Sequence, residues 1–383
     1  MLLNNVSIVD ARGRREGMML CLEEGYIVLA RKGYAGDGGL DLSGFTVLPG
    51  LIDSHVHLQL DGGADPLAGV NFSPPLRERC LELLRRGVVG LRDAGGAFNP
   101  GYAQAVLEPP ECFPRLICCG RPLTVPGGHC AAIGEPVRGE KEIRSAVQRQ
   151  LSGEGGWIKI MLTTGVVTGN RPPGQLQFSF DELLAAAIEA HGCGAKVAAH
   201  VQSREGVAMA VSAGVDSIEH GLGLTVELAR EMARREITLV STCTGFAAMA
   251  GKGRGEMAEK AARALQEQLR AVAVARGCGV RIVAGSDAGT PYNGFCGITA
   301  ELGWLRRAGL SWPEALASCT IQAAKMLGWN GLGLVAPGYR GDLLIVTGDP
   351  LQDPAALDNV AQVLRGCIPA AGKADLWAKE GIA

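Results

Sequence analysis

The sequence predicts an α/β protein, a (β/α)8 TIM barrel with a small β-sandwich domain formed from both termini. Three observations favour this fold class. Eight apolar runs follow one another from residue 46 onward, segments of helical pattern lie between most of them, and both ends of the chain carry short β-like pieces. Strands that alternate with helices are typical of a parallel sheet, and eight is the number of strands that closes a barrel.

The barrel elements are predicted from apolar runs and helical spacing. The candidate strands are Thr46–Leu58, Val88–Ala94, Arg115–Gly120, Trp157–Thr163, Lys196–Val201, Asp216–His220, Ile237–Thr242 and Arg281–Ser286. The candidate helices are Leu76–Arg86, Lys141–Gln150, Phe180–Ala190, Arg204–Ala213, Val226–Arg234 and Glu256–Arg276. The 55 glycines follow no fixed period, which fits many short loops.

The two ends of the chain differ from this central part. Residues 1–45 contain the β-like pieces Leu2–Val9, Met18–Leu22 and Tyr26–Ala30, separated by glycines and charged turns. Residues 334–383 contain an apolar strand within GYRGDLLIVTGDPLQDP, followed by short polar pieces. Because neither end can bury a core alone, we expect one composite β domain of residues 1–48 and 334–383 beside a barrel of residues 49–333.

Composition and charge exclude several classes of protein. The 383 residues are 47% hydrophobic and 20% charged, with a formal net charge of −2 and no block of Lys or Arg. This favours a soluble globular enzyme that acts on a small molecule. It argues against a protein that binds nucleic acid or an anionic membrane. We find no secretory leader pattern and no apolar run of membrane-spanning length. The 12 cysteines are scattered without a C-x-x-C pair, so we expect reduced thiols and a cytoplasmic location. Separately, we expect the protein to be a homo-oligomer.

Four of the six histidines lie at the ends of predicted strands. His55 and His57 are two residues apart on the first strand, so their side chains point to the same side. His200 and His220 end the fifth and sixth strands, and Asp287 follows the eighth. A single histidine in such a place is more often a hydrogen-bonded core residue, but these five converge at the C-terminal rim of a barrel. Imidazoles and carboxylates that converge in this way predict a divalent metal site, suited to zinc, manganese, cobalt or iron.

Lys159 lies inside the apolar fourth strand, in GGWIKIMLTTG. A lysine with its ordinary pKa near ~10.4 is cationic and repels a nearby metal ion. Three interpretations stay open: a neutral amine in a desolvated site, a carbamate formed with CO2 that bridges two metal ions, or a side chain that reaches solvent.

The motifs PGLIDSHVH, WIKIM, AAHV, SIEHG and GSDAG follow one another in the order of the ligand strands of a known family, and GYRGDLLIVTGDPL is similar to its closing β segment. Over nearly its whole length the chain resembles the amidohydrolase superfamily. GGHC at 127–130 and SDAGTPYN at 286–293 resemble its imidazolonepropionase-related branch, which includes Xaa-Pro dipeptidases (prolidases).

This resemblance implies two Zn²⁺ ions bridged by an N6-carboxylated lysine, with the metal ligands His55, His57, Lys159, His200, His220 and Asp287. The first ion would be bound by His55, His57 and Asp287, the second by His200 and His220, and Lys159 would bridge the two. Asp287 would also act as the catalytic base and then as the acid. Two such ions activate water and polarise a carbonyl group.

The resemblance also suggests substrate contacts. His129 would help to polarise the substrate carbonyl, although a loop histidine in a glycine-rich turn is an equal alternative. Gln202 stands where we expect an aromatic residue or histidine, and Arg171 is a candidate carboxylate anchor. Tyr292 and Asn293 are further candidates, with ordinary turn residues as the alternative.

Three further polar residues are not expected to bind the metal ions or the substrate. Asp53 is expected to orient a ligand imidazole from behind, and Cys130 departs from the glycine that often follows the GGH triplet. His191 ends a helical segment, where a cation suits the helix dipole, and is given no chemical role.

The predicted function is therefore metal-dependent hydrolysis of a peptide-like amide C–N bond, in a dipeptide or an N-acyl amino acid. Opening of a cyclic amide or imidazolone ring by the same site is the nearest alternative. A catalytically silent metal-binding scaffold is a third, disfavoured because no expected ligand is missing.

Overall fold

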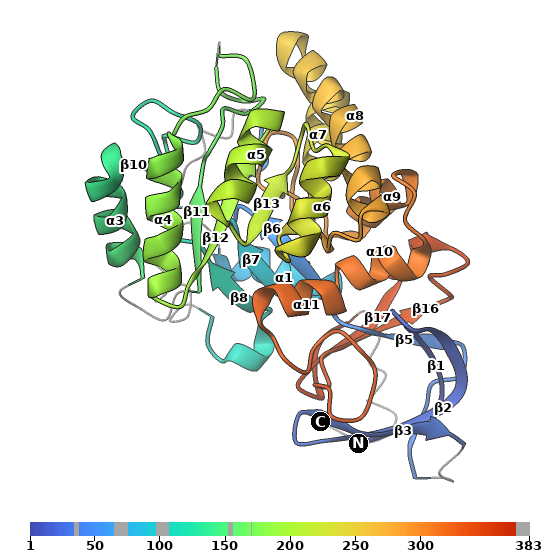
Figure 1. Cartoon of the computed structure of the whole chain (residues 1–383). Helices are drawn as coiled ribbons and strands as arrows, with labels where there is room; N and C mark the ends of the chain where they lie inside the picture. The colour runs from blue at the N-terminus through green and yellow to red at the C-terminus, as the bar shows by residue number, and fades with distance from the viewer. Residues whose placement is uncertain (34–37, 65–75, 97–106, 152–155, 170, 373–383) are drawn as a thin grey trace.

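The computed structural model describes residues 1–33, 38–64, 76–96, 107–151, 156–169 and 171–372. These residues form an α/β fold with one mixed sheet and two parallel sheets. The mixed sheet lies at the lower right of Figure 1, and the parallel strands lie behind a layer of helices.

The mixed sheet is built from both ends of the chain, in the order β18-β17-β16-β5-β1-β2-β3, with β4 beside β1. Its strands are β1 (Leu2–Asp10), β2 (Gly13–Glu23), β3 (Tyr26–Lys32), β4 (Leu40–Asp41), β5 (Phe45–Pro49), β16 (Leu343–Thr347), β17 (Val360–Arg365) and β18 (Ile368–Gly372). The two ends meet where β16 pairs antiparallel with β5, for example Ile345 with Val47. Both side chains belong to a buried apolar cluster of their own, together with Leu3, Ile8 and Leu20.

The parallel strands form a seven-stranded sheet, β10-β9-β11-β12-β13-β14-β15, and a three-stranded sheet, β6-β7-β8. Their bounds are β6 (Leu51–Val56), β7 (Val88–Asp93), β8 (Arg115–Cys118), β9 (Leu123–Thr124), β10 (Glu135–Pro136), β11 (Trp157–Ile160), β12 (Lys196–Val201), β13 (Ser217–His220), β14 (Thr238–Ser241) and β15 (Ile282–Ala284). Two backbone hydrogen bonds join β6 to the segment after β15: His57 N–H donates to Ala288 O (2.8 Å) and Asp287 N–H donates to His55 O (2.8 Å). These bonds bring residues from both parallel sheets to one place.

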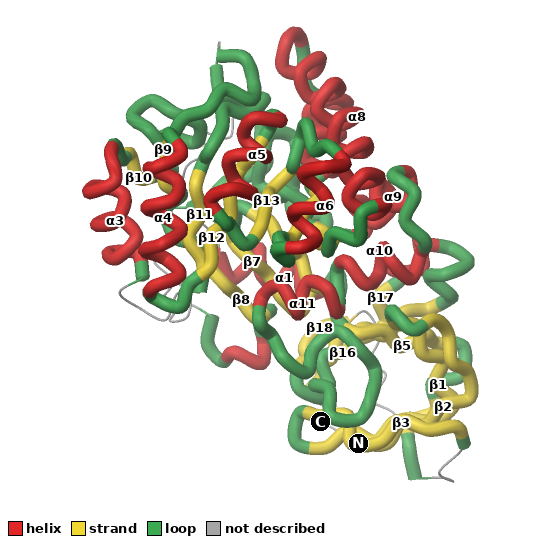
Figure 2. Tube along the Cα trace, in the orientation of Figure 1, coloured by secondary structure: helices red, strands yellow, loops and turns green. Residues whose placement is uncertain are grey.

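Helices cover the parallel strands on the outside, as Figure 2 shows in red around yellow. They are α1 (Leu76–Arg85), α3 (Gly139–Gln150), α4 (Phe180–Gly192), α5 (Arg204–Ala213), α6 (Val226–Arg234), α7 (Cys243–Lys252), α8 (Gly255–Gly277), α9 (Thr299–Arg307), α10 (Trp312–Ser318) and α11 (Ile321–Leu327), with short 3₁₀ turns η1 (Pro110–Cys112) and η2 (Pro354–Asp358). The six predicted helices are all present, and α5 and α6 have the predicted bounds. Ser179 and Ser203 cap α4 and α5 with side-chain hydrogen bonds, which explains why these helices begin where they do. Helices α7, α9, α10 and α11 were not predicted from the sequence.

One predicted strand, Thr46–Leu58, is wrong as a single element. The chain leaves the mixed sheet after β5 and enters the parallel sheet with β6, with Gly50 between them. A Cβ atom at Gly50 would lie 2.4 Å from a side-chain carbon of Val89, so only glycine fits where the chain passes this close to β7.

The C-terminal part also differs from its sequence-based description. Every residue of β17 is buried, between β16 and β18, where we expected only short polar pieces after β16. None of the helices described above has the length and apolar character that crossing a membrane requires.

Candidate metal centre and active-site pocket

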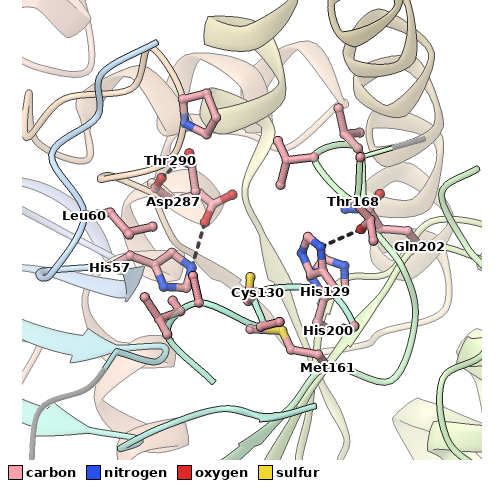
Figure 3. Close-up of a pocket in the computed structure, with 18 of the residues that line it drawn as sticks. His57, Leu60, His129, Cys130, Met161, Thr168, His200, Gln202, Asp287 and Thr290 are labelled. Atoms are coloured by element: carbon pink, nitrogen blue, oxygen red, sulfur yellow. Dashed lines mark hydrogen bonds and ion pairs between the residues drawn. The ribbon is translucent and has the colours of Figure 1, made fainter. Parts of the chain in front are cut away.

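A cavity of about 650 Å³ opens at the C-terminal ends of the parallel strands. All six residues predicted as metal ligands line it: His55, His57, Lys159, His200, His220 and Asp287. They come from β6 and the residue that follows it, from β11, β12 and β13, and from the loop after β15, and each is at most 5% exposed. Figure 3 shows His57 and Asp287 on one side of the pocket and His129 and His200 on the other.

Three of these residues form a compact donor cluster. The ligand atoms of His55, His57 and Asp287 all lie within 4.8 Å of one another. Asp287 Oδ1 is 3.3 Å from Nε2 of His55 and 3.4 Å from Nε2 of His57. Two imidazoles and a carboxylate in this arrangement are a donor set for a divalent cation.

The other three predicted ligands lie beside this cluster. The ring of His220 is 5.4 Å from that of His55 and 4.6 Å from that of His200, centroid to centroid. Nε2 of His200 and Nζ of Lys159 are buried and have no hydrogen-bond partner. Buried polar atoms are normally paired, so two unpaired ones around one cavity fit a site built to hold a cation.

The backbone is strained at two of these positions. His220 has φ +67° and Asp287 has φ +56°, a region that side-chain-bearing residues seldom adopt. Strain of this kind costs about 1–3 kcal/mol per residue and is found mainly at functional sites. The helix α7 packs closely over Asp287, since a Cβ atom at Gly245 would lie 2.8 Å from Asp287 Oδ2.

Burial favours the neutral form of four of the five histidines that line the pocket. It lowers the pKa of His55 to about 4 and the pKa values of His129 and His220 to about 3, and it lowers that of His200 well below its ordinary value. Neutral imidazole is the form that binds metal ions. Burial also lowers the pKa of Lys159, which favours a neutral, nucleophilic amine.

The carboxylate of Asp287 is held in its ionised form. Burial alone would raise its pKa, but the hydrogen bond with His57 and the neighbouring histidines outweigh this and hold the pKa well below the ordinary value. The same contact raises the pKa of His57 against the effect of its burial. Asp287 therefore presents a negative charge to the cavity.

The carboxylate behind His55 was not predicted from the sequence. Glu219 Oε2 lies 2.5 Å from His55 Nδ1, and Arg92 donates to both Glu219 oxygens (2.7 and 2.8 Å). Asp53 was expected in this role, but its Oδ1 accepts the backbone N–H groups of Ser286 and His55 and so holds β6 against the segment after β15. The signal for Glu219 was present in the sequence: a charged residue inside the apolar strand that ends in His220.

The predicted substrate contacts divide into two groups. His129, Gln202 and Arg171 line the cavity. His129 Nδ1 lies 2.7 Å from Thr168 Oγ1, and its ring is 4.4 Å from that of His200. Gln202 has a buried, unpaired Oε1, and Arg171 hydrogen-bonds Gly127 O, which ties two loops of the wall together.

Tyr292 and Asn293 are not part of the cavity wall. Asn293 Nδ2 donates to the carbonyl oxygens of Ser286 and Asp287 (both 2.8 Å) and so supports the loop that carries Asp287. Thr290 and Pro291 take the place on the wall that we expected for these two residues. His191 lies elsewhere, beside Asp216 (2.9 Å).

An apolar wall completes the pocket, and sequence analysis did not predict it. Phe246 and Met249 of α7 and Met257 of α8 line the cavity together with Met161 and Val166. The ring of Phe246 is 5.5 Å from that of His220, so this wall begins beside the candidate metal ligands. Phe246 and Met249 were not predicted as wall residues because the sequence-based prediction did not include α7.

Comparison with known proteins agrees with this geometry. Residues 46–373 match the model of the amidohydrolase family. The chain belongs to the amidohydrolase family. An uncharacterised protein of Mycobacterium tuberculosis is 32% identical over 327 residues, 84% of each chain. An ochratoxinase of Aspergillus niger is 27% identical over 345 residues, covering 80% of this chain and 71% of its own.

The solved structures similar to this family member include a prolidase in complex with N-methylphosphonate-L-proline. It superposes with a TM-score of 0.87 at 27% identity, over 97% of this chain and 99% of that one. The expected resemblance to the amidohydrolase superfamily and to its prolidase-like branch is thus confirmed. The chain is accordingly a hydrolase of the class that acts on amide bonds and takes a small-molecule substrate.

Proposed function

We propose that this protein is a metal-dependent amidohydrolase that cleaves the peptide-like C–N bond of a dipeptide or an N-acyl amino acid. The observation that carries the proposal is the donor cluster of His55, His57 and Asp287, with ligand atoms within 4.8 Å of one another, in the wall of a cavity that Lys159, His200 and His220 also line. The six residues supply the nitrogen and oxygen donors that divalent metal ions take.

The residues fit two Zn²⁺ ions. His55, His57 and Asp287 would hold the first, His200 and His220 the second, and N6-carboxylated Lys159 both. When bound, such ions lower the pKa of water and polarise a carbonyl group. The unpaired Nζ of Lys159, free of any hydrogen bond, supports the carbamate, because addition of CO2 to a neutral amine gives an anionic group in place of a repelling cation.

The chain's own residues would then carry the protons. Asp287, ionised and at the cavity wall, accepts the proton of the attacking water and delivers it to the departing nitrogen. His129, neutral and held at Nδ1 by the Thr168 hydroxyl, presents Nε2 to the substrate carbonyl oxygen. The left-handed backbone at Asp287 and the support from Asn293 keep the carboxylate in place.

The two walls of the cavity support the substrate class. Arg171 is the guanidinium on the wall and can bind a free carboxylate, while the unpaired Gln202 Oε1 can accept a substrate N–H. The apolar wall of Phe246, Met249 and Met257 suits an apolar side chain or acyl group. The similar prolidase that binds N-methylphosphonate-L-proline is consistent with a ligand of this kind.

The architecture is part of the same proposal. We infer that eight strands of the two parallel sheets, β6 to β8 and β11 to β15, make one (β/α)8 barrel of residues 49–333. The composite sheet of residues 1–48 and 334–383 would then be a flanking β-sandwich domain. The hydrogen bonds between β6 and the segment after β15 support closure of the barrel. The protein would act in the cytoplasm as a homo-oligomer.

A substrate panel tests the function. The zinc-loaded protein is assayed with dipeptides, N-acyl amino acids, their C-terminal amides and cyclic amides, each with small and large apolar groups. We expect turnover of carboxylate-bearing linear amides, best with large apolar groups, and no turnover by His55→Ala. Turnover confined to cyclic amides would move the assignment to ring opening, and metal binding without turnover of any amide would indicate a silent scaffold.

A further inference from the structure

A chain of polar contacts runs from the metal-site residue His55 away from the cavity into the core. It passes through Glu219 of β13 to Arg92 of β7 and Ser217 of β13. His55 is 1% exposed and the other three are 0% exposed, and only His55 lines the cavity. These residues therefore do not touch a substrate, and an effect on the site must pass through His55.

The contacts leave the Glu219 carboxylate no freedom to turn. Its Oε2 lies 2.5 Å from His55 Nδ1 and accepts from Arg92 Nη2 (2.7 Å), and its Oε1 accepts from Ser217 Oγ (2.6 Å) and Arg92 Nη2 (2.8 Å). Arg92 is fixed in turn, because Nε donates to Ser54 O (2.7 Å) and the guanidinium lies over the Trp157 ring, 4.6 Å from its centroid. Both oxygens of the carboxylate are thus committed.

This arrangement determines what His55 offers to the cavity. With Nδ1 donating its proton to Glu219, the lone pair is on Nε2, which lies 3.3 Å from Asp287 Oδ1 in the donor cluster. Two other predicted histidine ligands have neutral partners at Nδ1: His57 faces Gly95 O (2.8 Å) and His220 faces Thr242 Oγ1 (2.6 Å). Among these three imidazoles, His55 is the one that an anion supports.

We propose that Glu219, held by Arg92, is a positioning residue that fixes the ring orientation and tautomer of His55 and so sets the affinity for the first metal ion. This inference rests on the proposed function, because it concerns the same metal site. A carboxylate behind a metal-bound imidazole orients the ring and makes it a stronger donor, and its loss typically costs 10–100-fold in metal affinity or activity. The effect should fall on the ion bound by His55 rather than on the one bound by His200.

The test compares zinc affinity, measured by competition with a chromogenic chelator, between the native protein and two variants. Glu219→Gln keeps the shape but removes the charge, and we expect one of two zinc ions, the one bound by His55, to bind roughly 10–100-fold more weakly. Because Glu219→Gln leaves Arg92 as a buried unpaired charge, which is strongly destabilising, the double variant Glu219→Gln, Arg92→Met is made as well. It removes both charges together, and we expect the same loss of zinc affinity in a folded protein.

Arg365→Met is the matched control. Arg365 forms a buried ion pair with Asp342 in the mixed sheet, away from the cavity. The Arg365→Met variant should have a lower melting temperature and the zinc affinity of the native protein. Zinc affinity of the double variant within twofold of native would overturn the inference, and so would an equal loss in the control. A native protein that binds no zinc would instead overturn the proposed function, so the two failures can be told apart.

Discussion

His200 and His220 face each other from neighbouring strands, with Nδ1 of His200 2.9 Å from Nε2 of His220. Thr242 Oγ1 engages the other nitrogen of His220, whereas Nε2 of His200 is buried without a partner. In this pair of neutral imidazoles, the unpaired nitrogen of His200 can donate its lone pair to a metal ion. We therefore propose that this pair binds the second metal ion.

Removal of His200 should separate the two ions. We expect His200→Ala to retain about one zinc ion per chain where the native protein holds two, with turnover reduced by more than the roughly 10–100-fold that the loss of a residue behind a ligand costs. Metal content by elemental analysis is the measurement. His191→Ala, an exposed histidine paired with Asp216, is the control and should keep both ions. Two tightly held ions in His200→Ala would contradict the assignment.

Asp287→Asn should preserve the fold and lower kcat by about 10²–10⁴-fold, the usual contribution of a positioned proton carrier. The amide still has an oxygen to offer at the site, but it cannot accept the proton of water at neutral pH. Steady-state kinetics measures the loss, and circular dichroism checks the fold. Asn293→Ala, which removes the hydrogen bonds that support the Asp287 loop, should cost much less. An Asp287→Asn enzyme with native kcat would remove the residue from its proposed role.

Bicarbonate should increase the activity recovered when metal-free protein is reconstituted with zinc. Lys159 Nζ is buried and unpaired among the histidines, and CO2 converts it to an anionic carbamate. We expect the native protein to recover activity in proportion to bicarbonate. The control variant Lys196→Met should do the same, because Lys196 begins β12, at the opposite end of that strand from His200. Lys159→Ala should recover activity only when a short carboxylic acid is added. Full recovery of the native protein in CO2-free buffer would speak against the carbamate.

Arg171→Met should raise KM for substrates with a free carboxylate and change it little for their amides. A hydrogen bond to a charged group contributes about 1.5–3 kcal/mol, which corresponds to roughly 10–100-fold in KM. The comparison of each acid with its amide is the measurement. Arg121→Met is the matched control, because Arg121 also donates to a loop carbonyl, that of Gly134, but does not line the cavity. Equal KM changes for acid and amide would mean that Arg171 only supports the loop.

Acid should destabilise the mixed sheet through Asp10. Burial raises the pKa of Asp10, but the hydrogen bonds from Arg12 and the charges of Arg15 and Arg12 outweigh this and bring the pKa below its ordinary value of 3.8. A carboxylate whose pKa is lower in the folded state contributes stability above its unfolded pKa, and this is lost as the pH falls through the folded pKa. Native protein should therefore lose stability below about pH 4 more steeply than Asp10→Asn, which should be about 1–2 kcal/mol less stable at pH 7. Urea unfolding across this pH range measures both, and parallel pH profiles would contradict the prediction.

Local sequence patterns predicted some elements closely and others not at all. The apolar runs located β7, β12 and β13 to within a residue or two, and helical spacing located α5 and α6. The break at Gly50 escaped prediction because it depends on Val89, which lies far along the chain. Asp53 was given the place of Glu219 because it is near His55 in sequence, whereas Glu219 reaches His55 from another strand.

The sequence by itself determined the order of strands and helices, and it placed histidines and an aspartate at strand ends, because periodicity and spacing are local properties of the chain. It thereby named the residues that could meet. Only the tertiary structure decided which atoms face one another: Glu219 behind His55, Asn293 behind the Asp287 loop, and Phe246 and Met249 of α7 beside His220. These contacts join residues that are distant in sequence, and their partners are selected by packing and by the pairing of buried polar groups, which no local pattern encodes.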